Sequence, residues 1–93
     1  MGGDLKVIGK SSNIDIQMES SLVYIIKNAL DNKKGGDFIA EKCKELCGGS
    51  WIIINSSPGK GGSFDMFFAF TSLKWIKFKK GLFTSIYLFQ ISS

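Results

Sequence analysis

Residues 73–89 read LKWIKFKKGLFTSIYLF, and the order of polar and apolar side chains in this stretch defines a β-hairpin. Residues 73–79 alternate between apolar and charged side chains, which is the pattern of a half-buried strand. Lys80-Gly81 then supplies a tight turn, and residues 82–89 form a second, mostly apolar strand. Because strands joined by so short a turn run antiparallel, the stretch predicts an antiparallel sheet.

The alternation also assigns the faces of the first of these strands. Ile76 and Phe78 fall on one side, and Trp75, Lys77 and Lys79 fall on the other, since successive side chains of a strand point in opposite directions. One face of the strand is therefore predicted to be apolar and the other basic with one aromatic ring.

The part of the chain before this hairpin begins with an amphipathic helix. Asp15 is suited to cap its N-terminus, because its carboxylate can accept a bond from a free backbone N–H of the first turn. The apolar residues that follow recur at intervals of three and four, the spacing of one helix face. They are Met18, Leu22, Ile25, Ile26, Ala29 and Leu30.

A second, shorter helix is predicted after the break at residues 33–36. Asp37 is expected to cap it, and Gly48 and Gly49 are expected to end it in a left-handed conformation. Its inner face is predicted to contain Phe38 or Ile39, Cys43 and Leu46.

The remaining segments have the composition of strands and turns. Residues 6–8 predict a first strand, able to lie at a sheet edge, and residues 9–13 a turn. Residues 51–54 and 64–70 are β-branched, aromatic or apolar runs, and the turn-rich residues 55–62 separate them. Helices grouped in one part and strands in another predict an α+β fold, two N-terminal helices packed on an antiparallel sheet.

The length and composition fit a single domain spanning residues 1–93. The apolar fraction is 44%, the formal net charge is +4, and histidine is absent. Small domains bury a limited share of their surface, so dimerisation would add useful stability. No signal peptide or run of about 20 apolar residues is visible, which predicts a cytoplasmic protein with no membrane partner.

Residues able to carry chemistry are present, but none forms a convincing catalytic or metal site. Cys43 and Cys47 lie four apart on one helix face, which disfavours a mutual disulfide, and without histidine they leave a tetrahedral metal short of ligands. Ser57 or Ser63 as a nucleophile would have only a lysine as base, and residues 59–63 lack the spacing of a phosphate-binding loop. The sequence predicts a non-enzymatic protein without a cofactor.

A basic and aromatic cluster near the C-terminus offers a rival interpretation. Lysines that alternate with aromatic rings on a strand resemble a platform on which single-stranded nucleic acid stacks. The cluster comprises Lys74, Lys77, Lys79 and Lys80 around Trp75, Ile76 and Phe78. Since Phe78 points away from Lys77 and Lys79, a nucleic-acid partner is the less favoured hypothesis, and a solvated basic face remains a third.

The elements together resemble those of one known family. The residues that carry the resemblance are Lys6–Ile8, Met18–Asn32, Asp37–Ala40, Lys44–Leu46, Ser50-Trp51, Lys74–Phe78, Gly81 and Ile86–Phe89. In order and spacing they are similar to the small cytoplasmic dynein light chains of the light-chain-eight family, over nearly the whole chain. The resemblance implies a strand-swapped homodimer, in which a strand of each subunit crosses to the sheet of the other and binds extended peptides by strand addition.

That family resemblance also implies particular site residues. The crossing strand is expected within residues 62–70, and an apolar run of this kind would be protected by a dimer interface. The expected peptide groove contains Gly62, Ser63, Phe64, Asp65, Met66, Phe67, Phe68, Lys77, Lys79 and Gly36. The expected dimer interface contains Phe67, Phe68, Phe70 and Ile52. The groove strand has two possible alignments, one anchored on residues 62–64 and the other on residues 65–67.

Several residues depart from the family pattern. Gly35 and Gly36 replace a charged pair that engages a glutamine of the partner, and Lys77 and Lys79 replace two groove tyrosines. Ile52 replaces a histidine, so a histidine-based acid switch cannot operate. The expected partners are a second copy, dynein intermediate chain and extended, possibly acidic, peptides, in a microtubule-associated complex of the cytoplasm or in a dynein-independent dimerising hub.

Overall fold

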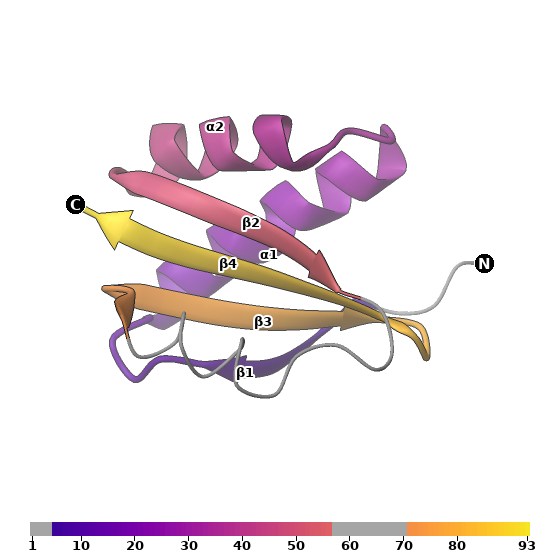
Figure 1. The fold of residues 1–93 in the computed structure, drawn as a ribbon, viewed down its shortest axis with the longest axis horizontal. Coiled ribbons are helices and arrows are strands. Elements are labelled where there is room, and N and C mark those ends of the chain that lie inside the picture. Colours follow the sequence, from indigo (N-terminus) through magenta and orange to yellow (C-terminus); the bar gives the residue numbers. More distant parts are fainter. Residues whose placement is uncertain (1–4, 57–70) are drawn as a thin grey trace.

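The computed structural model describes residues 5–56 and 71–93, and within these ranges the chain forms an α+β domain. The elements follow the order β1 (Leu5–Lys10), α1 (Ile16–Asp31), α2 (Gly36–Cys47), β2 (Ser50–Ser56), β3 (Lys74–Lys80) and β4 (Thr84–Ser92). The described strands form one antiparallel sheet in the order β1-β3-β4-β2, and α1 and α2 cover one of its faces (Figure 1). The predicted fold class is confirmed. The strand expected at residues 64–70 lies outside the described ranges.

Helix α1 forms as the sequence predicted. The Oδ1 of Asp15 accepts a hydrogen bond of 2.7 Å from the Met18 N–H, which caps the first turn. The apolar face places Leu22, Ile25, Ile26 and Ala29 in the core, and Met18 and Leu30 pack against it. The end of α1 is a Schellman motif: Lys33 adopts a φ of 55°, and the Lys34 N–H donates to the Ala29 carbonyl at 2.8 Å.

Helix α2 corrects two predictions. The helix begins at Gly36, with Gly35 at the N-cap, so Asp37 lies in the first turn and does not cap the helix. Its carboxylate there interacts favourably with the positive end of the helix dipole. Leu46 is exposed, and Cys47 packs against the core instead, because the burial face continues from Ile39 and Cys43 in steps of four.

The strands define which residues point toward the helices. Ile76 and Phe78 of β3 are fully buried in the helix-covered core together with Ile86 and Leu88 of β4, so the predicted faces of β3 are confirmed. Strand β1 lies at a sheet edge, as expected, but it extends to Lys10 through part of the predicted turn. Strand β4 begins at Thr84 instead of Leu82, because residues 81–83 form the turn.

Candidate functional site

The two edges of the described sheet differ in how open they are to another strand. Edge strand β1 contains a register shift between Val7 and Gly9 and carries Lys6 and Lys10, both of which discourage strand addition. Edge strand β2 has no charged residue and reads SWIIINS. It pairs along its length with β4 and, among the described residues, with no other strand. The β2 edge is therefore the one suited to pair with an added strand.

Residues of β2 alternate between the two sides of the sheet. Ile53 pairs with Leu88 and packs against the core on the helix side. Gly36, at the start of α2, lies over this residue, and a Cβ on Gly36 would lie 3.6 Å from the Ile53 Cβ. Ile52 and Ile54 point to the opposite side and are half-buried.

The sheet face away from the helices is apolar in the centre and basic toward β3. We call this surface the far face, and it comprises Ile52, Ile54, Trp75, Lys77, Lys79, Tyr87 and Phe89. The strand register arranges it in rows across the sheet. Trp75, Phe89 and Ile52 form one row, and Lys77, Tyr87 and Ile54 form the next.

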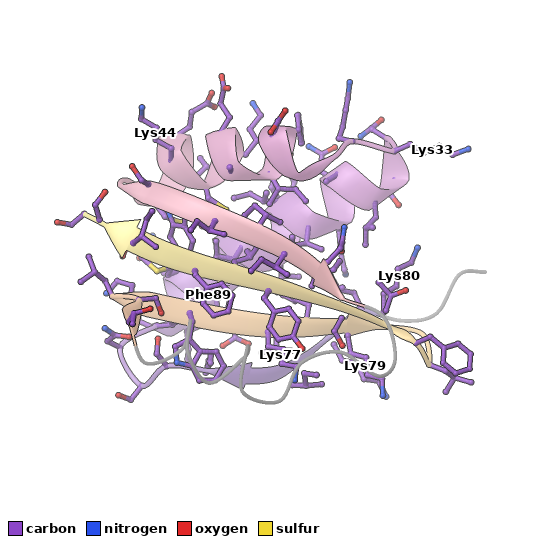
Figure 2. The ribbon with its side chains drawn as sticks, in the orientation of Figure 1. Lys33, Lys44, Lys77, Lys79, Lys80 and Phe89 are labelled. Atoms are coloured by element: carbon purple, nitrogen blue, oxygen red, sulfur yellow. The ribbon has the colours of Figure 1, made fainter. Side chains whose placement is uncertain are left out.

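The aromatic residues of β4 are closely associated with each other and with a lysine. The rings of Tyr87 and Phe89 stack with centroids 6.0 Å apart and planes inclined by 5°. The Lys77 ammonium lies 4.9 Å from the centroid of the Tyr87 ring, within the range of a cation–π interaction (Figure 2). Lys77 is thus directed over an aromatic ring of its own sheet.

Trp75 has a structural role at the β1 edge. Gly9 is the β1 residue beneath its ring, and a Cβ at Gly9 would lie only 3.2 Å from the Trp75 Cζ3. The Trp75 N–H donates to the Ser11 Oγ at 2.9 Å, and its carbonyl accepts from the Ser11 N–H at 2.9 Å. An aromatic ring laid over an edge glycine in this way supports a strand that would otherwise be weak.

The far face does not suit the stacking of nucleic-acid bases. Tyr87 is 4% exposed and Phe89 is 1% exposed, so neither ring offers a free face to a base. Trp75 is half-buried over Gly9. Since nucleic-acid platforms use exposed rings, these placements weigh against the nucleic-acid hypothesis.

A hollow of about 870 Å³ lies beside the first residues of β2. Its α2 wall carries three carboxylates at intervals of four, Asp37, Glu41 and Glu45, together with Lys44, and its floor includes Ser50 and Trp51. The predominant charge next to this part of the β2 edge is therefore negative. The four-residue spacing in the sequence was a signal that could have found this row.

The structure separates the predicted groove residues that it describes. Gly36 lies on the helix side of the sheet, whereas Lys77 and Lys79 lie on the far face of β3, with β4 between them and β2. One copy of the chain does not bring these three together. Residues 62–68 and Phe70, named for the groove or the interface, lie outside the described ranges, and Ile52 lies on the far face of β2.

Sequence reasoning missed Ile54, Tyr87 and Phe89 as members of the far face. The predicted strand at residues 82–89 is apolar at most positions, so its alternation carried no visible signal. The pairing of Lys77 with Tyr87 in the register of β3 and β4 shows which residues of β4 lie on the far face.

The two thiols are free and differ in burial. Burial, with a smaller contribution from Cys47, raises the pKa of the Cys43 thiol to about 12. The pKa of Cys47 is also raised, again chiefly by burial. Both therefore stay protonated and weakly nucleophilic near neutral pH. The described residues contain no group of three or more His, Cys, Asp or Glu that could hold a metal ion.

Comparison of the chain with protein-family models, with curated proteins and with solved structures found no match.

Proposed function

We propose that the chain is a non-enzymatic, dimeric adaptor of the dynein-light-chain type, which binds extended peptides by strand addition. The observation that carries the proposal is that β2, an uncharged and largely apolar strand, forms one edge of the sheet, whereas the other edge strand, β1, is protected. An edge of this kind is a template for another strand, and natural proteins keep one exposed only when something pairs with it. The resemblance of the elements to the light-chain-eight family supports the same function.

In this proposal, a strand from a second copy pairs with β2. The apolar residues of the far face, among them Ile52 and Ile54, then contribute to the contact between the two copies. The added strand presents its own free edge to the peptide, so main-chain hydrogen bonds supply affinity and side-chain pockets supply specificity. A groove that includes Gly36, Lys77 and Lys79 requires residues of both copies, because one copy places them on opposite faces.

The charges of the groove suggest its preference among peptides. Lys79 lies on the far face, and Lys77 contacts the Tyr87 ring, so Lys79 is the lysine better placed for a carboxylate of the peptide. We propose a preference for acidic peptides on this side. The carboxylates of α2 beside β2 oppose acidic residues there, which confines that preference to the part of the peptide near β3.

A peptide array tests the preference for acidic ligands. We expect enrichment of Asp and Glu among bound peptides and its loss in Lys79→Gln. Lys27→Gln, which removes an exposed lysine of α1 that does not line the hollow beside β2, is the matched control and should keep the enrichment. Retention of a glutamine-centred motif without acidic enrichment would refute the altered specificity.

Capture from native lysate separates the two adaptor hypotheses. Recovery of dynein intermediate chain with the full-length chain is expected for a motor subunit, and recovery of other dimeric partners without it is expected for a dynein-independent hub. For the nucleic-acid alternative, binding to a short single strand that weakens steeply with salt and is lost in Trp75→Ala would favour that function over peptide binding.

A further inference from the structure

The turn between β3 and β4 exposes two large apolar side chains that are not part of the hydrophobic core. Gly81 adopts a φ of 67° and allows the tight turn, and Leu82 and Phe83 follow it. Leu82 is 78% exposed and Phe83 is 67% exposed. Single apolar residues on a surface are ordinary, but two adjacent ones at a projecting turn form a small apolar tip without a packing partner in the core.

Lysines surround this tip on both sides of the sheet. We call Lys6, Lys79 and Lys80 the tip lysines. Lys79 and Lys80 end β3 immediately before the turn, and β1 places Lys6 directly opposite Lys79. Figure 2 shows Lys79, Lys80 and, from the end of α1, Lys33 toward the same end of the molecule as the turn.

The pairing of Lys6 with Lys79 has no benefit for the fold. Like charges directly opposite each other on neighbouring strands destabilise a sheet. An anionic surface that lies against the turn would relieve this repulsion. The like-charge pair and the exposed apolar tip are independent observations. The first indicates a negatively charged ligand surface, and the second indicates an apolar layer below that surface.

From this arrangement we propose that the β3–β4 turn is a membrane-contact tip, which inserts Leu82 and Phe83 into the interface of an anionic lipid bilayer. The tip lysines contact the phosphate and carboxylate groups of the lipids at the same time. A bilayer fits better than a pocket on another protein, because the tip projects and its lysines come from β1 and β3 around it. One flat anionic surface can touch all of them.

This proposal differs from the expectation of no membrane partner, which rests on the absence of a long apolar run. In the part of the chain that the structure describes, no helix is long and apolar enough to cross a membrane. Peripheral contact needs no such helix, since a few apolar side chains beside cations give reversible binding. Lys79 belongs both to this tip and to the proposed peptide groove, but Leu82, Phe83 and Lys80 belong to the tip alone, so variants of these three residues test membrane contact separately from peptide binding.

Flotation of the full-length chain with vesicles tests the proposal. Vesicles of phosphatidylcholine and phosphatidylserine should bind the protein, with binding that falls as salt rises, and vesicles of phosphatidylcholine alone should bind it much more weakly. The double variant Leu82→Ala/Phe83→Ala should lose at least about tenfold in affinity for the anionic vesicles, because both inserted side chains are removed. Ile16→Ala, which truncates an 80% exposed residue at the start of α1, is the matched control and should bind as the wild type does.

The contribution of charge has its own pair of variants. Lys80→Gln should weaken binding about fivefold, the effect of one lysine near an anionic surface, and Lys44→Gln should not change it. Equal binding to both kinds of vesicle, no binding to either, or wild-type binding by the double alanine variant would overturn the proposal. So would capture of a protein through the turn without any vesicle binding. If the double variant keeps its circular dichroism spectrum and its peptide binding, a loss of vesicle binding is due neither to misfolding nor to failure of the adaptor function.

Discussion

Substitution of Gly49 by alanine should destabilise the protein more than any other glycine substitution at the start of β2. Gly49 has a φ of 83°, and a Cβ built there would lie 2.1 Å from the Ser92 carbonyl oxygen and 2.7 Å from the Gln90 Nε2. The Gln90 side chain is held in place, because its Nε2 donates to the Gly48 carbonyl at 3.0 Å, and Ser92 is a register partner of Ser50 in the pairing of β2 with β4. The added methyl group must therefore displace the end of β4 from the start of β2.

The expected size of this effect follows from two costs. The left-handed backbone costs a non-glycine residue about 1–2 kcal/mol, and relief of the overlap by a backbone shift costs about 1–3 kcal/mol more. The free energy of unfolding should thus fall by about 2–5 kcal/mol, out of a total of about 5–14 kcal/mol for a chain of this length. The variant stays folded and measurable where the wild-type free energy of unfolding exceeds this loss.

Two other glycines, at the C-cap and the N-cap of α2, provide the controls. A Cβ at Gly48 would meet nothing within 4 Å, but its φ of 76° and ψ of 162° suit glycine alone, so Gly48→Ala should cost about 1–3 kcal/mol. Gly35 has an ordinary φ of −96° and open space around it, so Gly35→Ala should cost less than about 1 kcal/mol.

Urea unfolding followed by circular dichroism and tryptophan fluorescence measures all three variants, with similar slopes expected for a two-state transition. A Gly49→Ala variant no less stable than Gly35→Ala would refute this reasoning about the junction of α2, β2 and β4.

Three further predictions concern the helices. Lys33→Gly should raise the free energy of unfolding by about 0.5–1 kcal/mol, because Lys33 has a φ of 55° that glycine adopts without strain, and a lower urea midpoint would contradict this. Asp15→Ala should lower it by about 1 kcal/mol through loss of the bond to Met18, whereas an unchanged midpoint would mean that the cap contributes nothing. Cys43 should react with a thiol reagent only after unfolding, while Cys47 reacts slowly in the native protein. The pKa of Cys43 rises from 9.0 to about 12 on folding, so above pH 9.0 the unfolded chain loses this proton more readily than the folded one. The contribution of the buried thiol to the free energy of unfolding should therefore be complete below pH 9.0 and lost as the pH rises toward 12. Cys43→Ala should reduce this loss of stability at high pH.

Features set by neighbouring residues were predictable from the sequence. The three-and-four spacing from Met18 to Leu30 fixes the buried face of α1, and the alternation from Trp75 to Lys79 fixes the two faces of β3. Local rules were less accurate at the ends of elements. Asp37 has the right chemistry for a cap, but the observed cap is Gly35, so the helix begins two residues earlier than predicted.

Features set by contacts distant in the sequence were not predictable. The pairing of β1 with β3, the position of Trp75 over Gly9 and the contact of Lys77 with Tyr87 depend on strand order and register, which local patterns do not encode. The same limit applies to the candidate site. Lys77 and Lys79 were assigned to the correct side of their strand, but the distance of β3 from the open β2 edge became visible only in the sheet order.

Sedimentation equilibrium of the full-length chain at micromolar concentration tests the dimeric adaptor most directly. We expect a dimer for the wild type and a folded monomer for Ile52→Lys, which places a charge on the open β2 edge. Ile8→Lys is the matched control, because Ile8 is an exposed isoleucine on the protected edge strand β1, and it should remain a dimer. A wild-type chain that stays monomeric, or an Ile52→Lys variant that dimerises as the wild type does, would contradict the account.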